Sequence, residues 1–169
     1  HREDVRRGKE AKTSHLGLSL NEAKTRVVEA SSGFNFLGFN IKMVKNPRTG
    51  KTFPLVRPTK ESLKHIRMEI KGLTGRDRLA MPEQDTIRQI NKVVRGWAGY
   101  FHYGHCSQDL SALKVYLEER VRRYLIKRHR KRSRGYKAYP SNYLYDSLGL
   151  YKIPVTAPWR QTAKAFGRR

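Results

Sequence analysis

Basic side chains recur at helical spacing in three stretches of the chain, and rows of cations are suited to binding phosphate groups. The first row has intervals of four, three and four residues, which places its members on one helix face. Like charges at this spacing repel, so three rows of one sign favour a phosphate-binding surface over an ordinary solvated face. The candidate nucleic-acid-binding residues are Lys60, Lys64, Arg67 and Lys71 in the first row, Arg88, Lys92 and Arg95 in the second, Arg120, Arg123, Lys127, Arg130 and Arg134 in the third, and Arg128, Lys131 and Arg132 from the basic run at 127–134.

Five tyrosines follow this basic run. Cations neutralise phosphates and release counterions, and tyrosine rings stack on unpaired bases, so the combination suits a bound single strand. Alternatively, the rings pack the tail onto the rest of the fold, or the basic run is a membrane-surface or nuclear-import patch, although no juxtamembrane helix accompanies it. The tyrosines are Tyr136, Tyr139, Tyr143, Tyr145 and Tyr151.

His102, His105 and Cys106 form a cluster with metal-ligand character. They could supply three zinc ligands, but no fourth is evident in the sequence, so an ordinary loop between two helices is favoured. No Gly-rich phosphate loop, spaced pair of carboxylates or nucleophile elbow accompanies them, and Asp146 is isolated among tyrosines. We therefore predict no catalytic residue, no metal site and no cofactor for this chain alone.

The composition indicates the class of partner. The 169 residues include 37 Lys and Arg against 14 Asp and Glu, for a net charge of +23. With 37% hydrophobic and 30% charged residues, the chain can form one compact domain or two small ones, and it lacks the roughly 18 uninterrupted apolar residues of a membrane span. A single cysteine, Cys106, excludes an intramolecular disulfide framework and favours a reducing, cytoplasmic setting. We expect an acidic partner and no membrane.

Three amphipathic helices are predicted to carry the basic rows. Thr59 and Ser107 are expected to cap the first and third helices, and Pro82 to open the second. Trp97 and Phe101 continue an apolar seam and are expected in the bundle core rather than in stacking on RNA. The predicted helices and their seams are 60–72 (Leu63, Ile66, Ile70, Leu73), 83–102 (Ile87, Ile90, Val94, Trp97, Phe101) and 108–131 (Leu110, Leu113, Leu117, Val121, Tyr124).

The first 57 residues contain short runs of β type. We predict strands at 24–30, 35–45 and 51–57, with the last two joined as a hairpin by a five-residue loop at 46–50. Pro54 lacks a backbone donor, which places the last strand at a sheet edge.

These elements define the expected fold class and domains. The fold is predicted to be α+β and mostly α, with a small antiparallel β element before a three-helix bundle and a basic, aromatic-rich tail. The composition changes at Arg57 and Pro58. The expected units are a β hairpin unit at 1–57, a three-helix domain at 58–134 and a basic, tyrosine-rich segment at 135–169.

Several motifs occur in an order that resembles a known family. Leu16–Thr25 (LGLSLNEAKT) and Phe34–Phe39 (FNFLGF) resemble the last two sequence blocks of the palm of group II intron reverse transcriptases. Ile90–Phe101, which ends in RGWAGYF, is similar to the maturase-specific thumb region of that family. Further along, Gly149-Leu150-Tyr151, Pro154 and Trp159 resemble the segment that follows this region in the family.

The resemblance implies roles for the N-terminal unit. Residues 1–57 would be a remnant of the palm, in which Lys24 lies near the nucleotide site and Phe36, Leu37 and Gly38 support the primer end. For Phe36 and Leu37, simple packing within the sheet is the alternative.

The resemblance also implies a function and its limits. The chain lacks the palm block with the Tyr-Ala-Asp-Asp aspartates, so Mg²⁺-dependent phosphoryl transfer has no carboxylates here unless the missing palm is supplied. We therefore expect an RNA-binding maturase fragment that holds group II intron RNA, with DNA as a second candidate partner, and assists splicing or mobility. The alternatives are one part of an active RNA-directed DNA polymerase, and a generic basic structural protein of a ribonucleoprotein.

Overall fold

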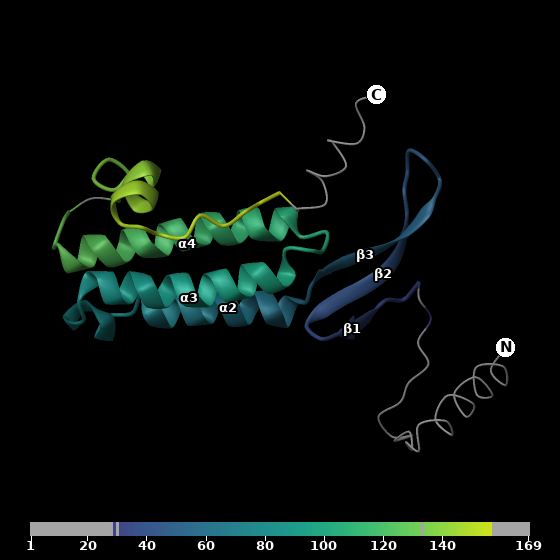
Figure 1. Ribbon diagram of the computed structural model, residues 1–169, viewed down its shortest axis with the longest axis horizontal. Helices are drawn as coiled ribbons and strands as arrows, with labels where there is room; N and C mark the ends of the chain where they lie inside the picture. Colours follow the sequence, from purple (N-terminus) through teal and green to yellow (C-terminus); the bar gives the residue numbers. More distant parts are fainter. Residues whose placement is uncertain (1–28, 30, 133, 157–169) are drawn as a thin grey trace, which may run out of the picture.

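The computed structural model describes residues 29, 31–132 and 134–156 and has a small sheet at one end of three long helices (Figure 1). The predicted fold class, α+β and mostly α, is confirmed. The predicted strand at 24–30 lies outside the described residues apart from Glu29, which is not part of a strand. In chain order the elements are β1 (Phe34–Phe36), β2 (Phe39–Lys45), β3 (Thr52–Pro58), α2 (Lys60–Leu73), the 3₁₀ turn η1 (Asp77–Ala80), α3 (Glu83–Phe101), α4 (Ser107–Arg128) and the π-helical turn η2 (Tyr143–Ser147).

β1 and β2 are joined by a tight turn, so the single strand predicted at 35–45 is wrong. β1 ends at Phe36 and β2 begins at Phe39, and these two residues pair across the antiparallel ladder. Leu37 and Gly38 between them have φ of 47° and 81°. Positive φ at both central residues gives a turn the twist that two-residue hairpins favour. Leucine is unusual in this conformation, which is why the sequence pattern did not indicate a turn.

β2 and β3 form the predicted hairpin with its boundaries shifted by one residue. Lys45 pairs with Thr52, so the loop contains six residues rather than five. Asn46 closes it, because its N–H donates to the Lys51 carbonyl at 2.8 Å. The sheet order is β1-β2-β3, so Pro54 lies on an edge strand as predicted.

All three predicted helices are present, and their starts follow the sequence signals closely. The Thr59 hydroxyl accepts a hydrogen bond from the Ser62 N–H at 3.1 Å, which confirms the N-cap of α2. α3 begins directly after Pro82, as predicted. α4 begins at Ser107, one residue before the predicted start, so Ser107 is its first residue and Cys106 holds the cap position instead.

α4 ends at Arg128, three residues before the predicted end. Arg130 has a φ of 50°, and the Lys131 N–H donates to the Ile126 carbonyl at 3.0 Å, a Schellman-type termination. Glycine usually occupies the left-handed position, and here an arginine does, so no sequence signal marked the end. Arg130 and Arg134 therefore lie beyond the helix, and their predicted place in the third helical row is wrong.

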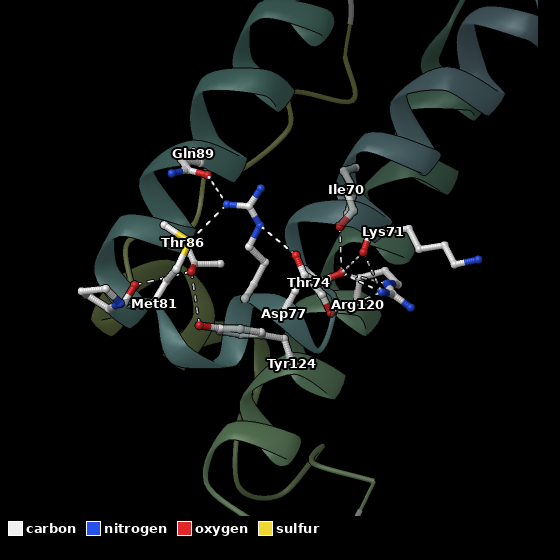
Figure 2. Close-up of polar contacts among 11 residues, drawn as sticks. Ile70, Lys71, Thr74, Asp77, Met81, Thr86, Gln89, Arg120 and Tyr124 are labelled. Atoms are coloured by element: carbon white, nitrogen blue, oxygen red, sulfur yellow. Dashed lines mark hydrogen bonds and ion pairs between the residues drawn. The ribbon is translucent and has the colours of Figure 1, made fainter.

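The apolar seams of the three helices meet in one core. Leu73 and Trp97 are half-buried and pack against this core, Leu63 is half-buried, and the other predicted seam residues are buried. Within the core, the Tyr124 hydroxyl donates to Thr86 Oγ1 at 3.3 Å (Figure 2). None of the described helices combines the length and apolar character needed to cross a membrane. The buried seam comprises Ile66, Ile70, Ile87, Ile90, Val94, Phe101, Leu110, Leu113, Leu117, Val121 and Tyr124.

The segment after α4 folds back over the bundle and completes this core (Figure 1). Asn91 on α3 fixes it through two hydrogen bonds, since its side chain donates to the Gly149 carbonyl and accepts from the Tyr151 N–H, each at 2.7 Å. The described part of the predicted tail is thus part of the folded domain. Its buried aliphatic side chains are Leu144, Leu148, Leu150 and Ile153.

The sheet is attached to the helices at the β1–β2 turn and at β3. The Gly38 carbonyl accepts from the Thr59 N–H at 2.8 Å. The Phe39 ring lies 4.8 Å from that of Phe101 on α3. On β3, the Arg57 guanidinium makes a bidentate ion pair with Asp109 in the first turn of α4, at 2.9 and 3.1 Å. These contacts fix the sheet against one end of the bundle.

Candidate nucleic-acid interface

The α2 stripe, which we define as Lys60, Lys64, Arg67 and Lys71, is exposed along its whole length. None of its members forms an ion pair with a residue that the structure describes. Tyr116 on α4 lines a groove of about 280 Å³ with them, donating its hydroxyl to the Arg67 carbonyl at 3.1 Å. Four cations therefore border one shallow groove between α2 and α4.

The α3 stripe, Arg88, Lys92 and Arg95, is also exposed and borders a cavity of about 530 Å³. Arg88 forms an exposed ion pair with Asp85 at 3.5 Å. The Arg95 guanidinium lies 5.2 Å from the centre of the Tyr151 ring, a cation–π contact with the C-terminal segment. This stripe carries less unneutralised charge than the α2 stripe.

Arg120 is directed into the bundle end and not toward solvent. Its guanidinium donates to the Thr74 hydroxyl at 2.8 and 3.0 Å and to the Lys71 carbonyl at 3.2 Å (Figure 2). Thr74 is the C-cap residue of α2 and donates its own hydroxyl to the Ile70 carbonyl at 2.7 Å. Arg120 thus satisfies carbonyls left open at the end of a helix.

Arg128 has a similar structural role between the end of α4 and the loop that precedes α3. It donates to the carbonyls of Leu79 and Met81 at 2.8 and 2.6 Å and pairs with Glu83 at 3.6 Å. His129 contacts the same carboxylate at 2.9 Å. The loop containing η1 is therefore held against the end of α4 by a cation that the sequence pattern assigned to the binding surface.

The remaining predicted cations surround the end of α4. A pocket, the Tyr136 pocket, is bordered by Arg123 and Lys127 on the helix and by Arg134 beyond it. Lys131 lies with its Nζ 5.0 Å from the Tyr139 ring centre. The side chains of Arg123, Lys127, Arg130, Lys131, Arg132 and Arg134 are all exposed.

A buried ion pair beneath this pocket was missed in the sequence. Arg122 donates to Glu118 Oε2 at 2.9 Å, and its Nε donates to the Tyr139 carbonyl at 3.0 Å. Glu118 also accepts from the hydroxyls of Ser141 and Tyr145, at 2.8 and 2.5 Å. The signal was available, because Glu118 and Arg122 are four residues apart on one helix face.

The pKa values of this network follow from its geometry. Burial acts to raise the pKa of the Glu118 carboxyl, but the bonds from Tyr145, Ser141 and Arg122 outweigh it and hold that pKa below its ordinary value. Burial, with the bond to Glu118, raises the pKa of Tyr145 far above its usual value. Glu118 is therefore an ionised acceptor that ties the C-terminal segment to α4.

The five tyrosines divide between the two interpretations considered for them. Tyr139 is buried, and Tyr143, Tyr145 and Tyr151 are half-buried against the core, as the packing alternative predicts. Tyr136 is the exception, with 56% of its surface exposed. Among these five rings, base stacking is open chiefly to Tyr136.

The side chains of His102, His105 and Cys106 each contact a different backbone group. His102 Nε2 contacts the Thr156 carbonyl at 2.7 Å, His105 Nδ1 accepts from the Val56 N–H at 3.3 Å, and the Cys106 thiol donates to a nearby carbonyl. Within the described residues, no three His, Cys, Asp or Glu side chains gather as a metal site would require. The loop interpretation of these residues agrees with their surroundings.

The positions matched to the palm lie in and before the sheet. Lys24 is outside the described residues. Phe36 and Leu37 are 58% and 68% exposed, so most of both side chains is open to solvent. Gly38 lies against the bundle, where an added β-carbon would meet Ser62 Oγ at 3.0 Å.

Comparison with known families identifies the helical part of the chain. Residues 63–140 match the family described as "Group II intron, maturase-specific domain", which confirms the resemblance noted for the maturase-specific region. The match runs from α2 past the Tyr136 pocket. No curated protein matches the chain at a significant level.

Residues 63–140 are therefore similar to a group II intron maturase-specific domain. This domain is related to reverse transcriptases and implies a maturase function in group II intron splicing. Its implied partner is intron RNA.

Proposed function

We propose that this chain is an RNA-binding maturase fragment that holds structured group II intron RNA and so assists splicing or mobility. The observation that carries the proposal is the α2 stripe, in which four exposed cations border one groove and have no acidic partner among the described residues. Ordinary helix surfaces mix charges of both signs, whereas phosphate-binding surfaces do not. The α3 stripe and the exposed cations at the end of α4 are further candidate contacts for phosphates.

The proposal assigns no catalysis to this chain alone. Phosphoryl transfer requires carboxylates that hold Mg²⁺, and the family's aspartate block does not occur in this sequence. We expect no primer extension by the chain with Mg²⁺ and nucleotides, and the roles near a primer for Lys24, Phe36, Leu37 and Gly38 apply only where a complete palm is present. DNA is a second candidate partner, and the cytoplasm is the proposed location.

A binding competition tests the proposal directly. Group II intron RNA and an unrelated structured RNA of equal length are titrated against the chain at several salt concentrations. Maturase function predicts a preference for the intron RNA, and each phosphate neutralised contributes roughly 0.7 to 0.9 to the slope of log K against log salt. Equal binding to both RNAs would favour the generic ribonucleoprotein alternative, and a slope near zero would contradict both.

A pair of matched variants locates the surface. Changing Lys60, Lys64, Arg67 and Lys71 to Gln removes four charges from α2 and should lower the salt slope by about 3. Changing Lys42, Lys45, Arg48 and Lys51 to Gln removes four exposed charges from the hairpin and should change the slope much less. Equal losses from both variants would show that binding follows net charge and not the α2 stripe.

A further inference from the structure

The Tyr136 pocket is an open hollow of about 420 Å³ where the last turns of α4 meet the segment that follows it. Sites for small organic ligands have volumes of about 300 to 1,000 Å³. The pocket is therefore large enough for a single nucleotide. Its walls combine cations with one exposed aromatic ring.

Gly135 positions that ring. Its φ is +83°, and a β-carbon added there would meet Ile126 Cδ1 at 2.6 Å, so a larger residue would be strained and would displace the Ile126 side chain. Tyr136 consequently sits close beside the helix, with the Arg122 Cζ 4.9 Å from its ring centre. Because Tyr136 is still 56% exposed, ring surface remains available to a ligand.

The charges around the ring are unequally neutralised. Arg122 is paired with Glu118 in the interior, and Arg123 is within 3.7 Å of Glu119. Lys127 and Arg134 form no ion pair with any described residue. Two uncompensated cations and an aromatic ring thus face one cavity.

We propose that this pocket binds an unpaired nucleotide of RNA, with its base stacked on Tyr136 and its phosphates held by Lys127 and Arg134. The inference rests on the proposed RNA-binding function and names one subsite within it. A base inside a duplex has both faces covered by its neighbours, so only an unpaired base can stack on a side chain. Glu119 adds an acceptor suited to the exocyclic amino group of a base.

Single-stranded oligonucleotides of equal charge provide the test. An eight-residue RNA that is abasic except for one 2-aminopurine near its centre is compared with one that is abasic at all eight positions, using the full chain. The base should bind more tightly, with quenching of the 2-aminopurine fluorescence. Tyr136→Leu should weaken binding of the base-containing oligonucleotide roughly five- to 150-fold and abolish the preference. Tyr136→Phe should retain both.

Tyr103→Leu is the matched control, since Tyr103 is 74% exposed and lies in the loop before α4. Equal affinity for the two oligonucleotides, or equal effects of Tyr136→Leu and Tyr103→Leu, would overturn the base pocket while leaving salt-dependent binding of intron RNA intact. Absence of salt-dependent binding to any RNA would instead overturn the proposed function. An acidic peptide could instead displace the oligonucleotide from the wild type but not from Tyr136→Leu. That result would assign the pocket to a protein partner and also overturn the inference.

Discussion

Arg120 on α4 donates two hydrogen bonds to the hydroxyl of Thr74, the residue that caps the C-terminus of α2, at 2.8 and 3.0 Å (Figure 2). A cation at this end of a helix also interacts favourably with the helix dipole. The contact joins α4 to the end of α2, and its two residues are 46 positions apart in the chain. Arg120 thus stabilises the fold, although its spacing alone placed it in a binding row.

We expect Arg120→Ala to lower the free energy of unfolding by about 1 to 3 kcal/mol, because the buried residue Thr74 and the Lys71 carbonyl lose their donor. Arg123→Ala is the control, since that side chain is 65% exposed and should change stability by less than about 0.5 kcal/mol. Urea denaturation measures both. Equal stability of the two variants would show that the Arg120 contacts contribute nothing to the fold.

Glu118 and Glu119 are adjacent but predicted to respond very differently to substitution. Glu118→Ala leaves Arg122 buried without its carboxylate and should cost about 3 to 5 kcal/mol. Glu119→Ala breaks only an exposed pair and should cost under about 1 kcal/mol. Thermal and urea unfolding measure the loss of stability in each variant. An equal loss in Glu119→Ala and Glu118→Ala would contradict a stabilising role of the Glu118 network.

The same carboxyl predicts a pH dependence. The pKa of Glu118 is lower in the folded chain than its ordinary value of 4.5, so in acid the unfolded chain binds the proton more readily. The stabilisation is complete above that ordinary value and is lost as the pH falls through the folded value. The difference in unfolding free energy between the wild type and Glu118→Gln should therefore shrink below about pH 4.5. A difference independent of pH would exclude an ionised Glu118 as its source.

Two variants should show that exposed residues of α4 contribute to RNA binding and buried residues to stability. Changing Arg123, Lys127 and Arg130 to Glu reverses three exposed charges, and should weaken RNA binding strongly with little change in melting temperature. Leu117→Ala removes a fully buried side chain and should cost about 2 to 5 kcal/mol while folded molecules still bind RNA. Intact RNA affinity in the triple variant would show that these cations do not bind RNA.

Periodicity predicted the helices well because each has one apolar face and clear boundary residues. Thr59 and Pro82 marked two starts, and the seam through Leu117 is buried. The sheet was predicted less well, since the β1–β2 turn uses Leu37 in a conformation that leucine seldom adopts.

Within the candidate site, spacing identified where cations lie and not what they contact. Arg120 shares the spacing of exposed cations and Arg128 belongs to the basic run at 127–134, but their guanidinium groups hydrogen-bond to Thr74 and Leu79 within the fold. Such contacts join residues more than 45 positions apart, and no local pattern reports them.

The folded-back C-terminal segment is synthesised after the helices that it covers, which affects when the core can form. Domains fold as units while the ribosome extends the chain at roughly 5 to 20 residues per second. Leu144, Leu148, Leu150 and Ile153 emerge after all three helices, so the nascent bundle lacks four of its buried side chains until then. Emergence of Ile153 from the ribosome is therefore the step that completes the core, and a chain that ended before these residues would expose the apolar surface that they cover.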